Sequence, residues 1–133
     1  MLLTDLHLSE IFNTTALDIY TILTDERRHG SFTGDVVFVS DTEGDRVSLA
    51  DGAIFGKAII LERGKKIIWS LAWLDENWPK NHISEVAIIL TDRTDGACTV
   101  ELFHTSIPQE FADEIKQFWP THYWESLRYY LER

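Results

Sequence analysis

The side chains with the most versatile chemistry in this sequence are five histidines and one cysteine. The histidines stand at positions 7, 29, 82, 104 and 122. No two of them form an i, i+4 pair and none has a cysteine at metal-ligand spacing, so the sequence predicts no metal site. Cys98 has no histidine near it in sequence, no Gly-x-Ser-x-Gly elbow occurs, and no glycine-rich loop opens a helix. We therefore expect no covalent nucleophile, no phosphate loop and no cofactor.

His104 is the strongest candidate for acid–base chemistry. A neutral imidazole beside an apolar cavity can exchange a proton near neutral pH. The competing interpretation is a structural histidine that is hydrogen-bonded within the core, since buried polar groups generally have partners. A single histidine is not a mechanism, so the sequence assigns no catalytic residue.

Alternation along two predicted strands, 82–90 and 97–105, suggests a ligand site. One face of the first strand carries Ser84 and Val86, and one face of the second carries Val100, Leu102 and His104. A following helix adds three large apolar side chains. The predicted ligand-binding residues are Ser84, Val86, Val100, Leu102, His104, Trp119, Tyr123 and Leu127. An apolar chamber with few polar groups suits a small hydrophobic molecule, but the same side chains could instead form a packed core.

The helix that must carry three of these residues spans 111–131. Its apolar residues recur every three or four positions, which is typical of an amphipathic helix packed along one stripe. Pro120 lies inside this span, where it removes one amide and clashes with the preceding turn. We therefore expect a kink or a break near Phe118, with one segment from about Gln109 to Phe118 and a longer one with Pro120 in its first turn.

The chain before this helix predicts a series of strands. A strand over 2–12 is followed by a short helix capped by Asn13, Thr14 or Thr15, and 25–30 forms a second short helix or a loop. Six further strands are expected, at 35–40, 46–50, 54–61, 66–74, 82–90 and 97–105, separated by turn residues. Short turns favour antiparallel neighbours. The predicted fold is thus an α+β helix-grip: a curved antiparallel sheet of about seven strands around a long C-terminal helix.

Composition and charge limit the functions that remain. The 133 residues suit a single domain over 1–133, and a net charge of −10 disfavours nucleic acid and anionic membranes as partners. No apolar run approaches the roughly 18 residues of a membrane span, and the N-terminus does not have the pattern of a secretion signal. We expect a cytoplasmic protein. Trp78 is expected to be exposed and to hint at a dimer contact, so both a monomer and a homodimer remain open. Arg27, Arg28 and His29 form the one compact basic cluster, which could bind an acidic partner or a ligand carboxylate but has a solvated face as its simplest interpretation.

A series of short motifs, in a consistent order over about a hundred residues, resembles one known family. The motifs are Thr24-Asp25, Phe32-Thr33-Gly34, Glu43-Gly44-Asp45, the segments 51–56 and 64–68, Trp78-Pro79, the segment 82–86, His104, Ile107-Pro108, Trp119 and Tyr123. In this pattern the chain is similar to the domain found in the C-terminal part of the Hsp90 ATPase activator Aha1, within the START-like or Bet v1-like (SRPBCC) superfamily. It departs from the family at Leu71-Ala72, where Trp-Arg is frequent, and at Phe118, where a glycine is usual.

The resemblance implies the helix-grip fold and leaves three functions. The first is a module that binds a small hydrophobic molecule between sheet and helix. The second is a co-chaperone-like interaction module for an Hsp90-type chaperone, which the family resemblance itself suggests. The third is a cyclase- or hydrolase-like enzyme that uses His104. We rank them in that order and expect a protein that is not an enzyme.

Overall fold

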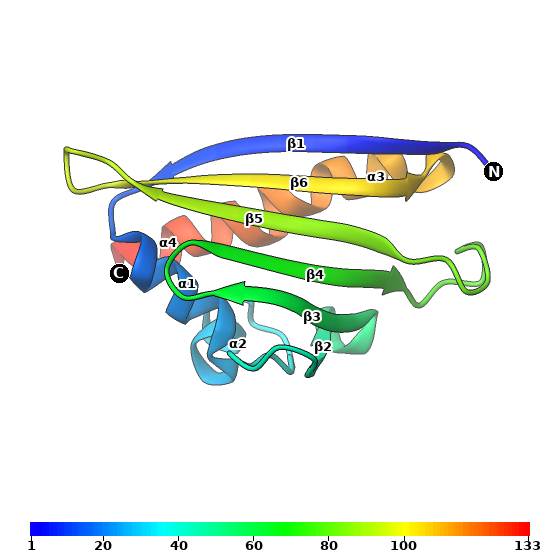
Figure 1. Ribbon diagram of the computed structural model, residues 1–133, viewed down its shortest axis with the longest axis horizontal. Coiled ribbons are helices and arrows are strands. Elements are labelled where there is room, and N and C mark those ends of the chain that lie inside the picture. Colours follow the sequence, from blue (N-terminus) through cyan, green and yellow to red (C-terminus); the bar gives the residue numbers. More distant parts are fainter.

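The computed structural model describes all residues 1–133, and its largest element is a six-stranded antiparallel sheet (Figure 1). The strands are β1 (Leu3–Phe12), β2 (Arg46–Leu49), β3 (Ile54–Glu62), β4 (Lys66–Trp73), β5 (Ser84–Asp92) and β6 (Cys98–Pro108). Their order across the sheet is β1-β6-β5-β4-β3-β2. The short connections between β2, β3, β4, β5 and β6 therefore join neighbours, and β1 pairs with β6 at one edge.

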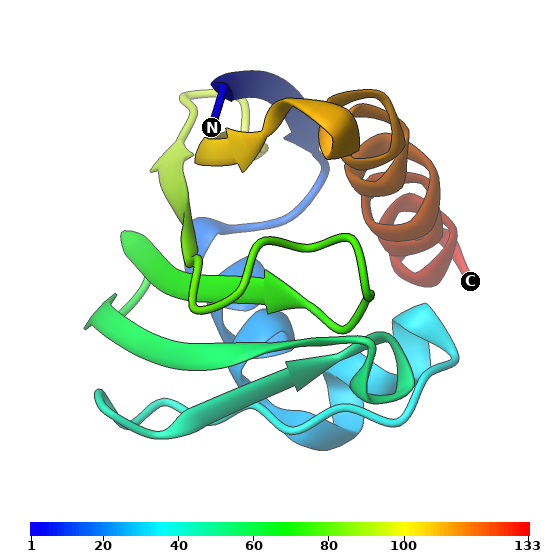
Figure 2. The same ribbon diagram turned by 90° about the vertical axis from the view of Figure 1, so that its right-hand side faces the viewer.

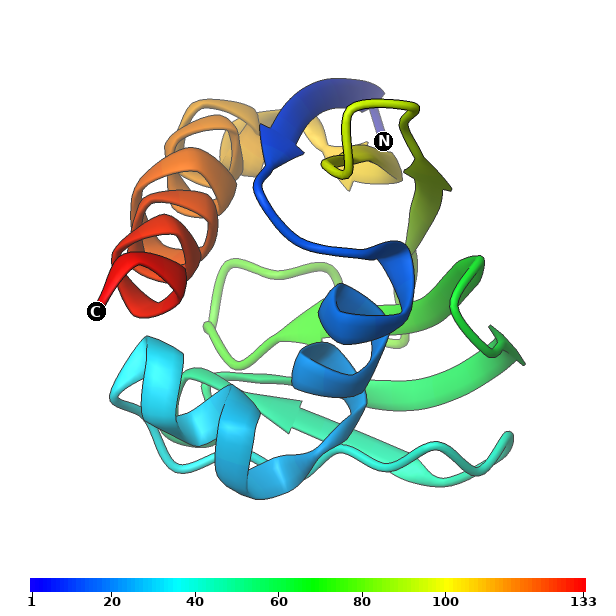
Figure 3. The ribbon, with the colours of Figure 1, turned by 90° about the vertical axis from the view of Figure 1, so that its left-hand side faces the viewer.

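Helices occupy the open side of the curled sheet, as the two end views show (Figures 2 and 3). Two short helices, α1 (Ala16–Thr24) and α2 (Glu26–Thr33), follow β1, and Thr15 caps α1 by accepting a hydrogen bond from the Asp18 amide. The C-terminal helical segments are η2 (Gln109–Phe111), α3 (Ala112–Phe118), η3 (Trp119–Glu125) and α4 (Ser126–Glu132). This is the helix-grip architecture that the sequence predicts.

The sheet turns one face of each central strand toward the helices. Trp69 and Leu71 of β4 are fully buried, whereas Ile68 and Ser70 on the other face are half-buried. Alternation alone does not distinguish the two faces of β4, and this difference in burial shows that the face with Trp69 and Leu71 meets the helices. The core thus lies between this concave face and the helical segments, and it includes Ile19, Leu23, Ile67, Ile88 and Leu102.

The predicted strand at 35–40 is wrong, and this reduces about seven strands to six. The segment makes one isolated bridge, between Phe38 and Ser48, and continues no ladder. At the start of this segment, a side chain replaces a strand partner: the Val36 amide donates its hydrogen bond to a carboxylate oxygen of Asp51 at 2.7 Å. Val37 and Val39 are nevertheless buried while Val36 is exposed, so the side chains of this segment alternate as they would in a strand.

The predicted boundary near Phe118 is present, but it is a change of helix type and not an interruption: α3 ends at Phe118, and η3 begins at Trp119 with Pro120 in its first turn. The backbone stays helical from α3 into α4, and η3 is a π-helix with Pro120 near its start. A π-helix is wider than an α-helix and bonds i to i+5, so it accommodates a ring and a missing amide that an α-helical turn would not. The apolar stripe therefore runs without a gap, and Trp119 and Tyr123 are both buried.

One glycine is required by the approach of two strands. A β-carbon added at Gly56 of β3 would lie 1.6 Å from the backbone oxygen of Ser70 in β4. No side chain fits there, because the atom in the way belongs to a hydrogen-bonded backbone. The close approach of β3 and β4 thus explains, in steric terms, the second glycine of the sequence segment 51–56.

Candidate functional site

The eight residues predicted to line a ligand site are brought together. Ser84 and Val86 of β5, Val100, Leu102 and His104 of β6, and three residues of the C-terminal helix all face the interior. Each is at most 1% exposed. The inward orientation inferred from alternation is therefore what the structure has. Whether these residues bind a ligand is a separate question.

The space between them is filled by aromatic rings. The Trp119 ring lies 4.9 Å from that of Tyr123, 5.0 Å from that of Phe118 and 6.0 Å from that of His104, centroid to centroid. None of the five main pockets of the molecule is lined by any of the eight residues. The sequence left open whether these side chains surround an open chamber or form a packed core. In this structure they form a packed core.

His104 is held in one neutral tautomer by a chain of hydrogen bonds. Trp119 donates its indole N–H to His104 Nδ1 at 3.1 Å, so Nδ1 carries no proton. His104 Nε2 must then be the protonated nitrogen, and it donates to Ser84 Oγ at 2.9 Å. The Ser84 hydroxyl in turn donates to the Leu71 carbonyl at 2.8 Å. Both ring nitrogens are therefore committed to structural bonds.

This environment disfavours the charged form of His104. Burial lowers the pKa of His104 from 6.5 to about 3. A proton added at Nδ1 would face the Trp119 N–H, which has no other acceptor in this network. Every buried side-chain nitrogen and oxygen atom has a hydrogen-bond partner. The surroundings of His104 therefore contain no unsatisfied side-chain group that a polar ligand could bond. The acid–base role considered from the sequence finds no free nitrogen on this ring.

His29 is a second buried histidine, and the sequence interpretation misplaced it. It was grouped with Arg27 and Arg28 on a solvated face, but it is fully buried on the inner side of α2. Its Nδ1 donates to the Leu23 carbonyl at 2.9 Å, so Nε2 accepts from the Tyr123 hydroxyl at 2.6 Å. Burial lowers the pKa of His29 to about 4, although the Leu23 carbonyl opposes the shift. The signal in the sequence was the i, i+3 spacing to Phe32, which also faces inward.

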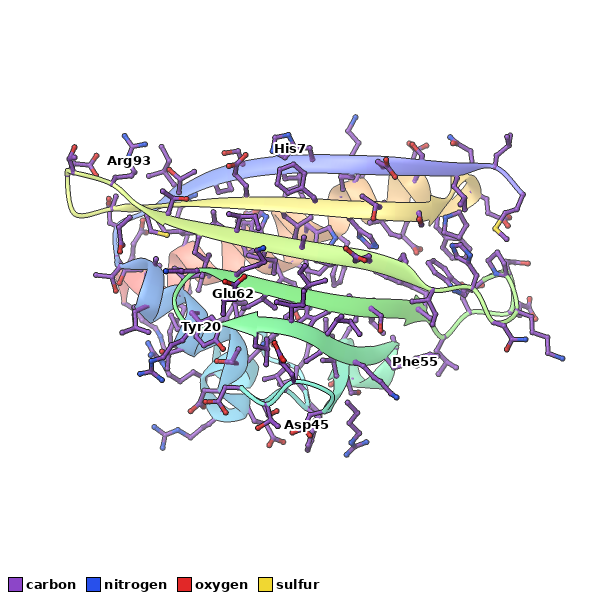
Figure 4. All side chains as sticks on the ribbon, viewed as in Figure 1. His7, Tyr20, Asp45, Phe55, Glu62 and Arg93 are labelled. Carbon is purple, nitrogen blue, oxygen red and sulfur yellow. The ribbon has the colours of Figure 1, made fainter.

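The most prominent hollow of the surface lies elsewhere, at the end of the sheet that carries the β4–β5 loop. It has a volume of about 730 Å³ and is lined by Phe55, Ala72, Trp73, Leu74, Asp75, Glu76, Trp78, Pro79, Lys80, Asn81, His82 and Ile83. We call it the loop groove. Figure 4 labels Phe55 at that end of β3. Trp78, which was expected to be exposed, is 8% exposed and belongs to the framework of this loop. Sequence reasoning did not foresee the groove.

Two other kinds of site receive no support from the structure. No three residues among His, Cys, Asp and Glu cluster in a way that could hold a metal ion. No helix is long and apolar enough to cross a membrane.

The chain matches a known family over most of its length. The family model described as "Activator of Hsp90 ATPase homolog 1-like protein" matches residues 13–132. The chain belongs to this family. The resemblance inferred from the motifs is therefore confirmed. In mouse, the Activator of 90 kDa heat shock protein ATPase homolog 2 is 27% identical to the chain over 127 residues, which are 96% of this chain and 38% of that protein. The chain thus spans under two fifths of the length of this relative.

Solved structures of the Aha1 type share the fold. An HSP90 activator from Plasmodium falciparum superposes with a TM-score of 0.87 at 18% identity, with 96% of each chain covered. An Aha1 dimer from Colwellia psychrerythraea superposes with a TM-score of 0.78 at 15% identity, covering 94% of this chain and 93% of that one. At these identities the likeness concerns the fold alone. Dimerisation is a property of the Colwellia protein, and the oligomeric state of this chain stays a prediction.

Proposed function

We propose that this Aha1-type domain is an interaction module that docks on an Hsp90-type chaperone and raises its ATPase activity. Membership of the activator family supports the proposal, as do relatives that are named as activators. The observation that carries it is the filled interior. Where a chamber was predicted, Trp119, Tyr123 and His104 pack against one another and satisfy each other's polar groups.

A filled interior directs attention to the surface of the domain. The rings and hydrogen bonds around His104 stabilise one conformation, and a rigid domain of this kind is suited to present a fixed surface to a partner. Large apolar side chains on that surface are the usual anchors of protein interfaces. Leu74 and Ile83 beside the loop groove are 73% and 60% exposed.

The proposal predicts that the purified chain raises the steady-state ATPase rate of an Hsp90-type chaperone in a saturable manner. The rate would be measured against protein concentration, with an Hsp90 inhibitor as the control for contaminating ATPases. A Gly56→Ala variant, which the Ser70 backbone oxygen should prevent from folding normally, controls for non-specific protein effects. An unchanged rate at concentrations where direct binding is saturated contradicts the proposal.

A small hydrophobic ligand between sheet and helix is the second candidate. Its support is the π-helix η3, because π-helical turns occur frequently at functional sites. Entry of such a ligand would require the helix to move away from β5 and β6, since none of the eight predicted residues lines any of the five main pockets. This candidate predicts that a lipid, sterol or aromatic acid raises the melting temperature in a dose-dependent way. A panel of such compounds that leaves the melting temperature unchanged removes this candidate.

A further inference from the structure

We propose that the loop groove is the docking site for a basic polypeptide segment with large apolar side chains at its centre. The inference rests on the proposed function and deepens it, because it names the surface and the chemistry of the partner segment. Three apolar side chains from separate elements surround the groove: Phe55 at the start of β3, Leu74 after β4 and Ile83 before β5. They are 44%, 73% and 60% exposed.

These three side chains are not part of the packed core of the domain. Leu74 and Ile83 lie outside the strands, and neither belongs to the core cluster. Isolated exposed apolar residues are ordinary, but several around one hollow mark interaction surfaces. The hollow, at about 730 Å³, has room for the large side chains of a bound segment.

The loop that forms the groove is held in place by specific contacts. The Trp78 indole N–H donates to the His82 carbonyl at 2.8 Å, and His82 Nε2 donates to the Ser106 carbonyl at 2.7 Å. The Trp78 ring also stacks on Trp73, with centroids 5.4 Å apart. Two residues of this framework, Asn81 and Ser106, have φ values of 62° and 61°, a region that non-glycine residues seldom adopt. A surface ordered in this way loses little conformational entropy on binding.

The strained backbone has a second implication. Asparagine adopts a positive φ more readily than most residues, so the value at Ser106 is the less common one and depends more on surrounding contacts. Asn81 lines the groove itself, and Ser106 holds the His82 side chain through its carbonyl oxygen. The framework contacts therefore fix the shape of the groove before any partner arrives.

The acidic side chains at the rim of the groove favour a basic partner. Asp75 and Glu76 lie at the rim, both exposed, and neither takes part in any of the six ion pairs of the protein. Glu85 is also exposed and takes part in no ion pair, two residues beyond Ile83, whereas the basic side chains that line the groove are Lys80 and the half-buried His82. With a net charge of −10 on the chain, this rim repels phosphate-rich surfaces and attracts lysine and arginine.

The test uses a labelled peptide with a Leu-Trp-Leu centre between lysine pairs, and fluorescence anisotropy against the whole chain. Two further peptides are matched to it, one with glutamates in place of the lysines and one with a Gly-Ser-Gly centre. We expect the basic apolar peptide to bind at least about tenfold more tightly than either, and its affinity to fall as salt is raised. Equal affinity for the acidic peptide overturns the proposal.

Variants locate the site. Ile83→Asp should weaken binding of the basic apolar peptide by about tenfold or more, and Glu76→Lys should weaken it and flatten its salt dependence. Val36→Asp and Glu132→Lys are matched controls, since Val36 is 77% exposed and Glu132 is exposed, and neither lines the groove. Melting temperatures of all four should stay near the wild-type value. Equal loss of binding in the control variants places the site elsewhere and overturns the proposal.

The same variants separate this inference from the proposed function. If the wild-type chain stimulates the chaperone and Ile83→Asp stimulates it equally, the groove proposal fails and the function stands. If the basic peptide binds the groove but the chaperone does not respond, the function fails and the groove stands. If the basic apolar peptide does not bind the chain at all, the groove proposal fails, whether or not the chaperone responds.

Discussion

Trp119→Ala is expected to remove most of the stability of the domain. The Trp119 side chain is fully buried and contacts the rings of His104, Phe118, Tyr123 and Trp124. Truncation of a buried tryptophan costs about 3–5 kcal/mol. The lost indole N–H also leaves His104 Nδ1 without a partner, which adds about 1–3 kcal/mol. Since small domains are stable by about 5–15 kcal/mol, the variant should be partly unfolded at 37 °C.

Urea unfolding, followed by far-UV circular dichroism, measures this loss. Trp119→Phe keeps most of the ring volume but removes the donor, so its smaller loss separates packing from hydrogen bonding. Tyr129 belongs to the same helical region but is 74% exposed. Tyr129→Ala should therefore change the free energy of unfolding by less than about 0.5 kcal/mol. If Trp119→Ala were as stable as Tyr129→Ala, the core would not be filled in the way described.

Acidification from about pH 7.5 to about pH 5.5 is expected to lower the free energy of unfolding by about 2–3 kcal/mol. Burial lowers the pKa of His29 to about 4 and the pKa of His104 to about 3, whereas both titrate near 6.5 in an unfolded chain. Below 6.5 the unfolded state therefore binds two protons that the folded state does not. The stability that these histidines contribute is fully present above 6.5 and is lost as the pH falls toward the folded values.

Urea unfolding at each pH measures the slope. His104→Gln should reduce the loss between the two pH values by about half, whatever its effect on stability at neutral pH. His7→Gln is the surface comparison, because it removes a histidine of the edge strand β1, 3.0 Å from a Glu101 carboxylate oxygen, and leaves both buried histidines in place. The chosen range stays above the pH at which most carboxylates take up protons. A wild-type stability that is constant over this range contradicts the neutral, hydrogen-bonded assignment of both histidines.

The parts of the fold that the sequence predicted are those in which side-chain periodicity and burial agree. Alternation in 82–90 and 97–105 placed Ser84, Val86, Val100, Leu102 and His104 on the inner face, and each is buried there. The strand predicted at 35–40 does not form, and the Asp51 side chain accepts the hydrogen bond that the Val36 amide donates. Pairing depends on partners far away in sequence, which periodicity does not encode.

The continuity of the helix at Pro120 and the burial of His29 have a common physical origin. Tertiary packing of the apolar stripe keeps the helix continuous at Pro120 and widens it to a π-helix, against the local preference for a break. His29 lies next to two arginines in sequence, yet helical geometry turns it inward to bond Tyr123. In both cases the deciding contact is a long-range one, and Tyr123 in η3 takes part in both.

The loop groove could not be predicted from local patterns at all. Its walls come from β3, the end of β4 and the loop before β5, and its framework depends on the Trp78 and His82 bonds. The Trp-Pro motif at 78–79 contributed to the family resemblance, but it did not predict the conformation of the loop. The fold, the inner face and the family were thus accessible from the sequence, while the surface that now carries the functional proposal required the structure.

Direct binding between the purified chain and an Hsp90-type chaperone, measured by titration calorimetry, tests the central claim that the domain works through its surface. The account predicts saturable binding by the wild-type chain, loss of at least about tenfold in affinity for Ile83→Asp, and unchanged affinity for Val36→Asp. Absence of binding by a wild-type chain that is shown to be folded would contradict the claim.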